Sequence, residues 1–466
     1  MKLAILGGGG FRTPFIYHAL LNDEGSPRVT EVALFDVDES RLRNTRAILR
    51  QMAAAFPDAP RVTSTTEIRR AIEGSDFVFA AIRVGGLAER RCDEHVALDL
   101  GVLGQETTGP GGLAFAIRTI PVMLSYAQLV KELAPDAYFL NFTNPAGIIT
   151  EALQTVLGDR VLGICDTPSS LSRRVAESLG LDPSLVQTDY IGLNHLGWLR
   201  RVIYDGKDML PALIADDRLL AAVEEGTLFG LDWIRALGVI PNEYLYYYYF
   251  NRDAVRAILD SPMTRGDYLQ QTQDQLFSRL EKSPDGAAQL WYQAVNERNA
   301  SYMSEARAVT QPKAAHAFAL DADPFAEGYA GVALSVMRAI SRNERTTMIL
   351  NVRNQNTLAG LPHDAVIEVS TLVDTNGVHP ISTSQPSLDQ IGLMQQVKAV
   401  ERHTIAAAVH GDRTEALKAF SLHPLVDSVT IGKQLLAGYI DRIPEVAAIL
   451  GQSKAADSLA STNHRP

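Results

Sequence analysis

The chain has 466 residues, of which 46% are hydrophobic and 21% are charged, values ordinary for a globular protein of two or three domains. Its formal net charge of -11 argues against a nucleic-acid partner, because phosphate backbones are bound by concentrated Lys and Arg. The cysteines, Cys92 and Cys165, are too few for a disulfide framework, so we expect a cytoplasmic location. The first apolar run is too short for a signal peptide or a membrane span, so no membrane partner is expected.

Short apolar runs in the first third of the chain predict buried strands. They lie at residues 2–6, 31–35, 77–81, 137–140 and 161–164. Helical patterns lie between them, at residues 13–21, 39–55 and 113–134. Strands that alternate with helices at this spacing predict an α/β fold with a doubly wound parallel sheet.

Four consecutive glycines, Gly7, Gly8, Gly9 and Gly10, follow the first predicted strand and precede a helix. A helix N-terminus offers unpaired N–H groups to a pyrophosphate, and glycine allows the backbone to approach it closely. Asp36 ends the second strand, where an acid binds the ribose 2′-OH and repels a 2′-phosphate. The turn therefore predicts NAD binding, although Arg12 occupies a motif glycine position and a loop without a ligand is the alternative.

The pattern changes after residue 166, where long helical stretches enclose strands at 189–193 and 365–369. We predict a Rossmann-type NAD-binding domain at residues 1–165 and a mixed α/β catalytic, substrate and oligomerisation domain at 166–452. Residues 453–466 are small and polar, which predicts a disordered tail.

Polar segments follow several predicted strands, at the edge where open α/β sheets bind ligands. They are residues 82–86 (IRVGG), 104–112 (GQETTGPGG) and 141–145 (NFTNP). Glycines beside Arg, Gln, Glu and Thr predict loops shaped around a polar ligand. The Asn and Pro residues of 141–145 are equally typical of a simple turn.

Cys165 and His195 each follow a strand-like run and belong to residue types that bind metals. A lone cysteine is more often a core residue, so these two residues alone favour a structural role. Tyr244 begins a block of tyrosines that extends to Tyr249, most of which we expect in the core. One of them can act as a general base beside a cation.

Together these segments resemble glycoside hydrolase family 4, the NAD- and metal-dependent phospho-glycosidases. The resemblance covers nearly the whole chain through the blocks GGGGFRTP, IRVGG, GQETTGPGG, NFTNPAG, ICDTP, GLNHLGW, PNEYLYYYY and NVRN. Several blocks in one order are far more specific than any single block. The resemblance implies an N-terminal sheet like that of lactate and malate dehydrogenases, and a homodimer or homotetramer.

The resemblance also implies an unusual mechanism, because most glycosidases use two carboxylates and this family uses NAD instead. NAD⁺ takes a hydride from C3 of the sugar, and a base then removes the acidified proton at C2. A divalent metal, usually Mn²⁺, stabilises the enediolate as a Lewis acid. Elimination at C1, addition of water and return of the hydride complete a hydrolysis without net redox change.

The matched positions assign roles to individual residues. Cys165 and His195 match the metal ligands, Tyr244 the base at C2 and Asp166 a catalytic acid; a thiolate is an unusual ligand for Mn²⁺. We predict that the cofactor contacts are Gly7, Gly8, Gly9, Gly10, Phe11, Arg12, Asp36 and Arg83. The predicted substrate contacts are Arg90, at the 6-phosphate, with Asn144, Asn194 and Arg265, because guanidinium groups offer several fixed donors to a phosphate.

Asp166 leaves the sugar anomer open. An Asp after the cysteine resembles the phospho-α-glucosidase branch, where it acts as an acid towards the leaving group, whereas residues 83–87 (RVGGL) resemble the β branch. We predict hydrolysis of a phosphorylated disaccharide or glucoside as a 6-phospho-β-glucosidase, with 6-phospho-α-glucosidase as the alternative. A 2-hydroxyacid dehydrogenase of the malate or lactate type is the second alternative, and a non-catalytic NAD sensor is a further one.

Overall fold

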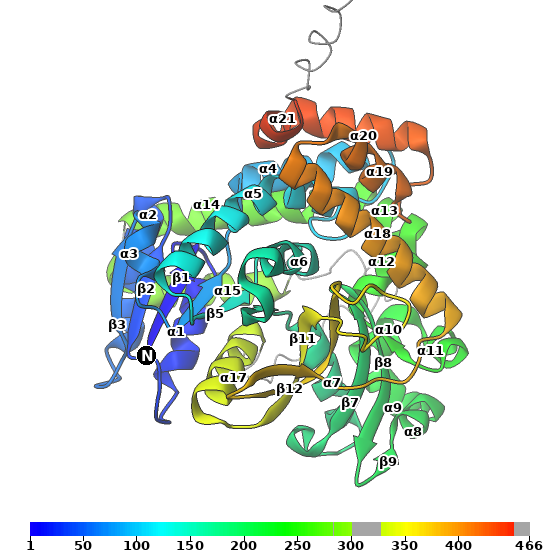
Figure 1. The fold of residues 1–466 in the computed structure, drawn as a ribbon, viewed down its shortest axis with the longest axis horizontal. Coiled ribbons are helices and arrows are strands. Elements are labelled where there is room, and N and C mark those ends of the chain that lie inside the picture. Colours follow the sequence, from blue (N-terminus) through cyan, green and yellow to red (C-terminus); the bar gives the residue numbers. More distant parts are fainter. Residues whose placement is uncertain (283, 301–327, 452–466) are drawn as a thin grey trace, which may run out of the picture.

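The computed structural model describes residues 1–282, 284–300 and 328–451, so the predicted disordered tail lies outside the described residues. The described strands form one continuous sheet in the order β10-β8-β7-β12-β11-β6-β5-β4-β1-β2-β3, with β13 beside β12 and β9 beside β8 (Figure 1). The parallel strands are β1 (Lys2–Leu6), β2 (Glu31–Phe35), β3 (Arg61–Thr65), β4 (Phe77–Ala80), β5 (Tyr138–Asn141) and β6 (Val161–Gly163). The strands that join in antiparallel fashion are β7 (Gln187–Leu193), β8 (Leu196–Tyr204), β9 (Lys207–Asp208), β10 (Ile240–Pro241), β11 (Thr346–Arg353), β12 (Val366–Asp374) and β13 (Gly377–Pro380).

The parallel half of the sheet confirms the predicted Rossmann-type fold. Its strand order β3-β2-β1-β4-β5-β6 is that of a doubly wound dinucleotide-binding sheet, with the direction of winding reversed between β1 and β4. Ligands bind such sheets at this reversal, beyond the carboxyl ends of the strands. The turn at residues 7–10 follows β1 at this position.

Side chains alternate across the central strand β1. Leu3 and Ile5 belong to one hydrophobic cluster, and Ala4 and Leu6 belong to another. Because successive residues of a strand point to opposite faces, both faces of the sheet are buried. This explains why the inner parallel strands are continuous apolar runs without a polar alternation.

Helices cover both faces of the sheet. In the first part of the chain they are α1 (Thr13–Leu21), α2 (Glu39–Ala53), α3 (Ile68–Ile72), α4 (Gly86–Leu98), α5 (Pro110–Leu133), α6 (Ala146–Leu157) and α7 (Thr167–Ser178). The middle part contains α8 (Leu210–Ala215), α9 (Asp217–Ala222), α10 (Glu224–Phe229), α11 (Leu231–Leu237), α12 (Tyr246–Tyr249), α13 (Asn251–Asp260), α14 (Arg265–Lys282) and α15 (Ala287–Ala300). The last part contains α17 (Tyr329–Arg342), α18 (Leu388–His410), α19 (Arg413–Leu422), α20 (Val429–Arg442) and α21 (Pro444–Leu450).

Late helices of the chain pack on early ones. The helices α18 to α21 lie over α4 and α5 at the top of Figure 1, and α14 and α15 pack against α2. Within the described residues, α5 alone is long and apolar enough to cross a membrane by length and composition, but most of it is buried inside the molecule. Its contacts with α4, α6 and α18 are those of a core helix.

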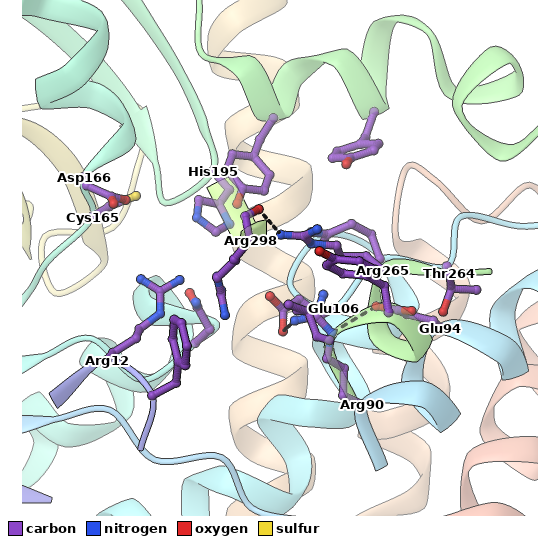
Figure 2. A pocket seen from close by; sticks show the side chains of 18 of the residues that line it. Arg12, Arg90, Glu94, Glu106, Cys165, Asp166, His195, Thr264, Arg265 and Arg298 are labelled. Carbon is purple, nitrogen blue, oxygen red and sulfur yellow. Dashed lines mark hydrogen bonds and ion pairs between the residues drawn. The ribbon is translucent and has the colours of Figure 1, made fainter. Parts of the chain in front are cut away.

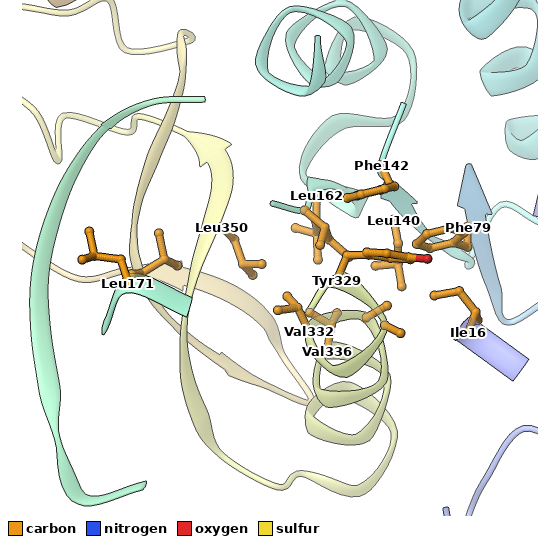
Figure 3. Packing of buried hydrophobic residues seen from close by; sticks show 14 of the residues in the cluster. Ile16, Phe79, Leu140, Phe142, Leu162, Leu171, Tyr329, Val332, Val336 and Leu350 are labelled. Carbon is orange, nitrogen blue, oxygen red and sulfur yellow. The ribbon is translucent and has the colours of Figure 1, made fainter. Parts of the chain in front are cut away.

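The helix α17 packs on the parallel half of the sheet although it begins only at Tyr329, long after β6 ends at Gly163. Figure 3 shows Tyr329, Val332 and Val336 of this helix facing Leu140 and Leu162, which lie on β5 and β6. Residues late in the chain therefore complete the core beside the predicted nucleotide-binding turn.

The two halves of the sheet join where β11 pairs antiparallel with β6. The register places Asn351 opposite Gly163, and a Cβ on Gly163 would lie 2.6 Å from the Cβ of Asn351. The glycine therefore allows the close approach of the two strands. The sheet runs from one predicted domain into the other without a break, so it does not mark a boundary between them. The predicted division into residues 1–165 and 166–452 therefore stays a prediction.

Candidate functional site

A cavity of about 570 Å³ lies beyond the carboxyl ends of the parallel strands. The predicted site residues that line it are Phe11, Arg12, Arg90, Asn144, Cys165, Asp166, His195, Tyr244 and Arg265. The remaining predicted residues are not part of this lining: they are Gly7, Gly8, Gly9, Gly10, Asp36, Arg83 and Asn194. The fold thus brings together side chains from segments that are far apart in sequence.

The glycine turn after β1 packs tightly against its own chain. Gly7 has a φ of +86°, and a Cβ there would lie 2.6 Å from the carbonyl oxygen of Ala81. A Cβ on Gly9 would lie 2.7 Å from the Cβ of Arg41. The absence of side chains is therefore required by the turn itself, in addition to the predicted approach of a pyrophosphate.

Asp36 holds the glycine turn through its carboxylate. One oxygen accepts a hydrogen bond of 3.0 Å from the backbone N–H of Gly9, and the other accepts one of 3.1 Å from that of Asp38. Burial raises the pKa of Asp36 while these two hydrogen bonds lower it, and the net direction is upward. The carboxylate thus lies beside the turn, where the sequence places the ribose of a dinucleotide.

The residues after the glycines enter the cavity. The guanidinium of Arg12 lies over the rings of Phe142 and Tyr329, at 4.7 and 4.9 Å from their centroids. The hydroxyl of Tyr329 donates to the carbonyl oxygen of Arg12 at 3.0 Å, and the indole of Trp291 donates to that of Phe11 at 2.9 Å. These contacts fix the start of α1 against α15 and α17.

Cys165 and Asp166 follow β6 and begin α7 at one side of the cavity (Figure 2). Burial, together with the carboxylates of Glu368 and Asp166, raises the pKa of the Cys165 thiol well above its ordinary value. The thiol therefore keeps its proton in the absence of a cation, and binding of a metal releases that proton.

His195 lies in the two-residue turn between β7 and β8, with a φ of +62°. This left-handed conformation is uncommon for a residue with a side chain and occurs often at functional sites. Its Nδ1 lies 3.0 Å from the hydroxyl of Thr107, and its ring stacks on that of Tyr244. Burial lowers the pKa of His195 to about 3, so the imidazole is neutral at physiological pH.

Tyr244 follows the short strand β10 and lies in a 3-10 turn before α12. The side chain of the buried Asn242 accepts a hydrogen bond of 3.1 Å from the backbone N–H of Tyr244. The amide of Asn242 in turn donates to the hydroxyl of Tyr190 at 3.2 Å. The tyrosine predicted as a base is thus placed by a buried polar network, whereas Tyr246 and Tyr247 lie in the core as expected.

Three guanidinium groups, which we call the arginine cluster, line the cavity. They belong to Arg90, Arg265 and Arg298, and Figure 2 shows Arg90 and Arg265 opposite Cys165, with His195 and Arg298 between. Burial, and then the neighbouring charges of Arg12, Arg265 and Arg90, lower the pKa of Arg298 to about 9. This repulsion indicates an excess of positive charge that suits a bound anion.

Glu106 lies among these cations. Burial alone would raise its pKa, but the guanidinium groups of Arg83, Arg90, Arg298 and Arg12 lower it to about 2. Its carboxylate pairs with Arg90 at 2.8 Å and with Arg83. The guanidinium of Arg83 also lies over the ring of Phe115, at 4.6 Å from its centroid. This predicted cofactor contact is therefore held by Glu106 and Phe115 and is not part of the cavity lining.

Asn194 is also outside the cavity lining, and its amide donates a hydrogen bond to the buried carboxylate of Glu368 on β12. Glu368 accepts hydrogen bonds from Asn194 at 3.1 Å, Asn351 at 2.8 Å and Tyr190 at 3.3 Å. Burial raises the pKa of Glu368 to about 7 against the effect of these donors. This carboxylate ties the turn that contains His195 to β11 and β12.

Three residues at or beside the cavity, Arg298, Tyr329 and Glu368, were not predicted from the sequence. Arg298 and Tyr329 lie on α15 and α17, whose positions depend on packing alone. Glu368 carried a usable signal, because it is the one acid within the apolar run 365–369 (AVIEV). A buried charge in such a strand indicates a bound partner or a functional site.

The fold and the cavity together define an α/β enzyme of the dinucleotide-dependent class. Residues 2–181 match the family 4 glycosyl hydrolases, and residues 190–426 match the family 4 glycosyl hydrolase C-terminal domain. These matches cover most of the chain. The chain therefore belongs to the family 4 glycosyl hydrolases, as the sequence predicted.

Relatives with curated names cover nearly the full chain. The sequence is 31% identical over 447 residues to the probable 6-phospho-beta-glucosidase of Bacillus subtilis, which is 94% of this chain and 95% of the relative. It is 28% identical over 471 residues to the maltose-6′-phosphate glucosidase of Fusobacterium mortiferum, which is 96% of this chain and 99% of the relative. Because a 6-phospho-alpha-glucosidase of Leptotrichia buccalis is a further relative, at 29% identity over 460 residues, the relatives include enzymes named for both anomers.

Solved structures give the same result. The 6-phospho-beta glucosidase of Thermotoga maritima, in a structure with NAD and glucose-6-phosphate, superposes with a TM-score of 0.80 at 26% identity, covering 96% of this chain and 99% of that chain. Another structure of that enzyme contains manganese as well. The malate dehydrogenase of Salinibacter ruber shares the fold alone, with a TM-score of 0.50 at 14% identity, covering 89% of this chain and 99% of that one.

Proposed function

We propose that this chain hydrolyses 6-phospho-β-glucosides with NAD and a divalent cation such as Mn²⁺. The proposal rests on a single cavity that contains both the candidate metal ligands with the candidate base and a group of arginines suited to a phosphate. Cys165, His195 and Tyr244 line it together with the arginine cluster, and Figure 2 separates Cys165 from Arg90 and Arg265. Curated 6-phospho-β-glucosidases of the family support the same activity and cofactors.

The residues present fit both NAD and a divalent cation. Cys165 and His195 offer a thiol and a neutral imidazole to one cavity, but the described residues contain no ready group of three or more His, Cys, Asp or Glu side chains that could hold a metal. Two protein donors leave positions open for oxygen atoms of a bound sugar. The glycine turn, the start of α1 and Asp36 have the order of a dinucleotide site.

When bound, NAD⁺ supplies a reversible hydride acceptor and the cation supplies a Lewis acid. The arginine cluster binds the 6-phosphate through charge-assisted hydrogen bonds and thereby positions the sugar ring. Tyr244 takes the proton from C2 as a phenolate, and His195, which is stacked beside it, would hold the cation that favours this form. Asn144, in the wall of the cavity, binds sugar hydroxyls.

Asp166 favours one second candidate, hydrolysis of 6-phospho-α-glucosides by the same sequence of steps. Its side chain lies in the cavity wall next to Cys165, and a Cβ on Gly328 would approach it at 3.7 Å. A carboxyl group in this position can donate a proton to the leaving-group oxygen. Curated relatives with maltose-6′-phosphate specificity support this alternative.

Cleavage of nitrophenyl 6-phospho-α- and 6-phospho-β-glucoside tests both candidates. The assay is run with and without NAD⁺ and with and without Mn²⁺. We expect release of nitrophenol from the β anomer only when both are present, with no accumulation of NADH. Release from the α anomer instead selects the second candidate, and cleavage without NAD⁺ overturns both.

A further inference from the structure

The segment 105–107 (QET) lies between the arginine cluster and His195, and its side chains face two different partners. Glu106 pairs with Arg90 and Arg83. Gln105 and Thr107 instead form a hydrogen-bonded group that ends on the imidazole of His195, which is 88 residues away from Thr107 in the sequence. The sequence analysis predicted that this segment shapes a ligand loop, and the proposed mechanism leaves Gln105 and Thr107 without a role.

The amide of Gln105 has a fixed orientation. Its Oε1 accepts hydrogen bonds of 2.6 Å from the backbone N–H groups of both Thr107 and Thr108. A backbone N–H can only donate, so the atom that faces both of them must be the amide oxygen and not the nitrogen. The same Oε1 lies 3.0 Å from the hydroxyl of Thr107.

The hydroxyl of Thr107 has one proton, and this proton decides the state of His195. Since Oε1 of Gln105 can only accept, the hydroxyl of Thr107 must donate to it. The hydroxyl oxygen is then left as an acceptor towards Nδ1 of His195, at 3.0 Å. This arrangement assigns the proton of the imidazole to Nδ1 and leaves Nε2 as the nitrogen with the free lone pair.

We propose that Gln105 and Thr107 are positioning residues that hold His195 in the tautomer able to bind a divalent cation through Nε2. The inference rests on the proposed function, which assigns His195 to the metal. A histidine ligand generally donates its other N–H to a nearby acceptor, which fixes the ring and its tautomer. Here the acceptor is a hydroxyl whose own proton is committed to Gln105.

The adjacent Thr108 provides a matched control. It has the same side chain, but its buried hydroxyl has no hydrogen-bond partner among the described residues. Only its backbone N–H contacts Gln105, and a substitution of the side chain keeps that contact. Thr107→Val and Thr108→Val therefore remove the same atoms from neighbouring positions, and only the first breaks the link to His195.

The test measures Mn²⁺ affinity by titration calorimetry, with NAD⁺ and glucose 6-phosphate present. We expect Thr107→Val to weaken Mn²⁺ binding by about 10- to 100-fold, the usual effect of removing the partner of a metal-bound histidine. Thr107→Ser keeps the hydroxyl and restores the affinity, and Thr108→Val leaves it unchanged. Equal affinity in Thr107→Val and Thr108→Val overturns the inference.

The variants Cys165→Ser and His195→Ala separate this inference from the proposed function. If they bind Mn²⁺ as tightly as the parent, the assignment of the metal pair is wrong. If they bind it weakly while Thr107→Val does not, only the role of Thr107 is wrong. A spectroscopic measurement on the parent protein tests the inference even if a variant fails to fold. The ring ¹⁵N shifts of His195 are measured in the metal-free parent and assigned by the loss of the signal in His195→Gln. We expect them to show a proton on Nδ1, and a proton on Nε2 overturns the inference.

Discussion

The imidazole ring of His195 stacks face to face on the phenol ring of Tyr244, with centroids 3.6 Å apart and an interplanar angle of 4°. The two residues come from different segments, the β7–β8 turn and the 3-10 turn after β10. A cation held by the imidazole would favour the ionised form of the neighbouring phenol. The stack therefore links the proposed metal ligand to the proposed base.

The first prediction concerns the base. Tyr244→Phe keeps the ring stacked on His195 but removes the hydroxyl, so we expect kcat to fall by about 10²- to 10⁴-fold, the usual contribution of a general base. Incorporation of solvent deuterium at C2 of the product falls with it. Mn²⁺ affinity, measured as a control, stays near that of the parent. Full exchange at C2 in the variant would show that another group takes the proton.

The second prediction concerns the arginine cluster. Arg298→Gln removes a positive charge that the neighbouring guanidinium groups destabilise and that a bound phosphate would stabilise. We expect KM for the 6-phosphoglucoside to rise by about 10- to 100-fold, which corresponds to a charge-assisted hydrogen bond of ~1.5–3 kcal/mol. Arg91→Gln serves as the control, because Arg91 pairs with Asp267 at the surface. An unchanged KM in Arg298→Gln would remove this residue from the phosphate site.

The inner parallel strands were predictable because they are buried on both faces. The strands β1, β2 and β4 are apolar runs and lie almost where the sequence predicts them. The edge strand β3 (Arg61–Thr65) was missed, because it is only half-buried and has the polar sequence RVTST. The joining of β11 to β6 depends on the fit of Asn351 against Gly163, and no local pattern signals such a fit.

The site shows the same division between local and long-range information. Cys165, His195 and Tyr244 follow strands and were identified through their motifs, and the fold brings them to one cavity. Arg298 was missed because it reaches the cavity only through the packing of α15 against α2. The hydrogen bond of Thr107 to His195 was missed for a similar reason, since a motif gives the spacing of residues along the chain and not their partners across it.

The third prediction concerns cofactor choice. Asp36→Ala removes a carboxylate that holds Gly9 and that is expected to bind the ribose of NAD⁺. We expect NAD⁺ to bind about 10- to 100-fold more weakly, as on loss of hydrogen bonds to a charged group. The affinity for NADP⁺ falls less, because the repulsion between the carboxylate and the 2′-phosphate is also removed. Calorimetric titration with both cofactors measures the change in preference. Asp38→Ala is the control, since Asp38 caps α2 and only its backbone N–H contacts Asp36.

The fourth prediction concerns the contact between α21 and α4. Burial and a hydrogen bond to Glu445 raise the pKa of Glu89 to about 8, and the same hydrogen bond lowers the pKa of Glu445. The two carboxyl groups therefore share one proton at neutral pH, beside the guanidinium of Arg118. The ordinary pKa of a glutamic acid is 4.5, so the folded state holds this proton more tightly than the unfolded state.

The sign of the pH effect follows from that difference. The stabilisation by the shared proton is fully present below about pH 4.5 and is lost as the pH rises through about 8. Glu89→Gln replaces the shared proton with an amide donor that does not titrate, so we expect the Tm of the parent to fall relative to that of the variant between about pH 4.5 and about pH 8. Thermal unfolding followed by circular dichroism measures both profiles. The exposed Glu67→Gln should follow the parent, and parallel profiles for the parent and Glu89→Gln would mean that no shared proton holds α21 on α4.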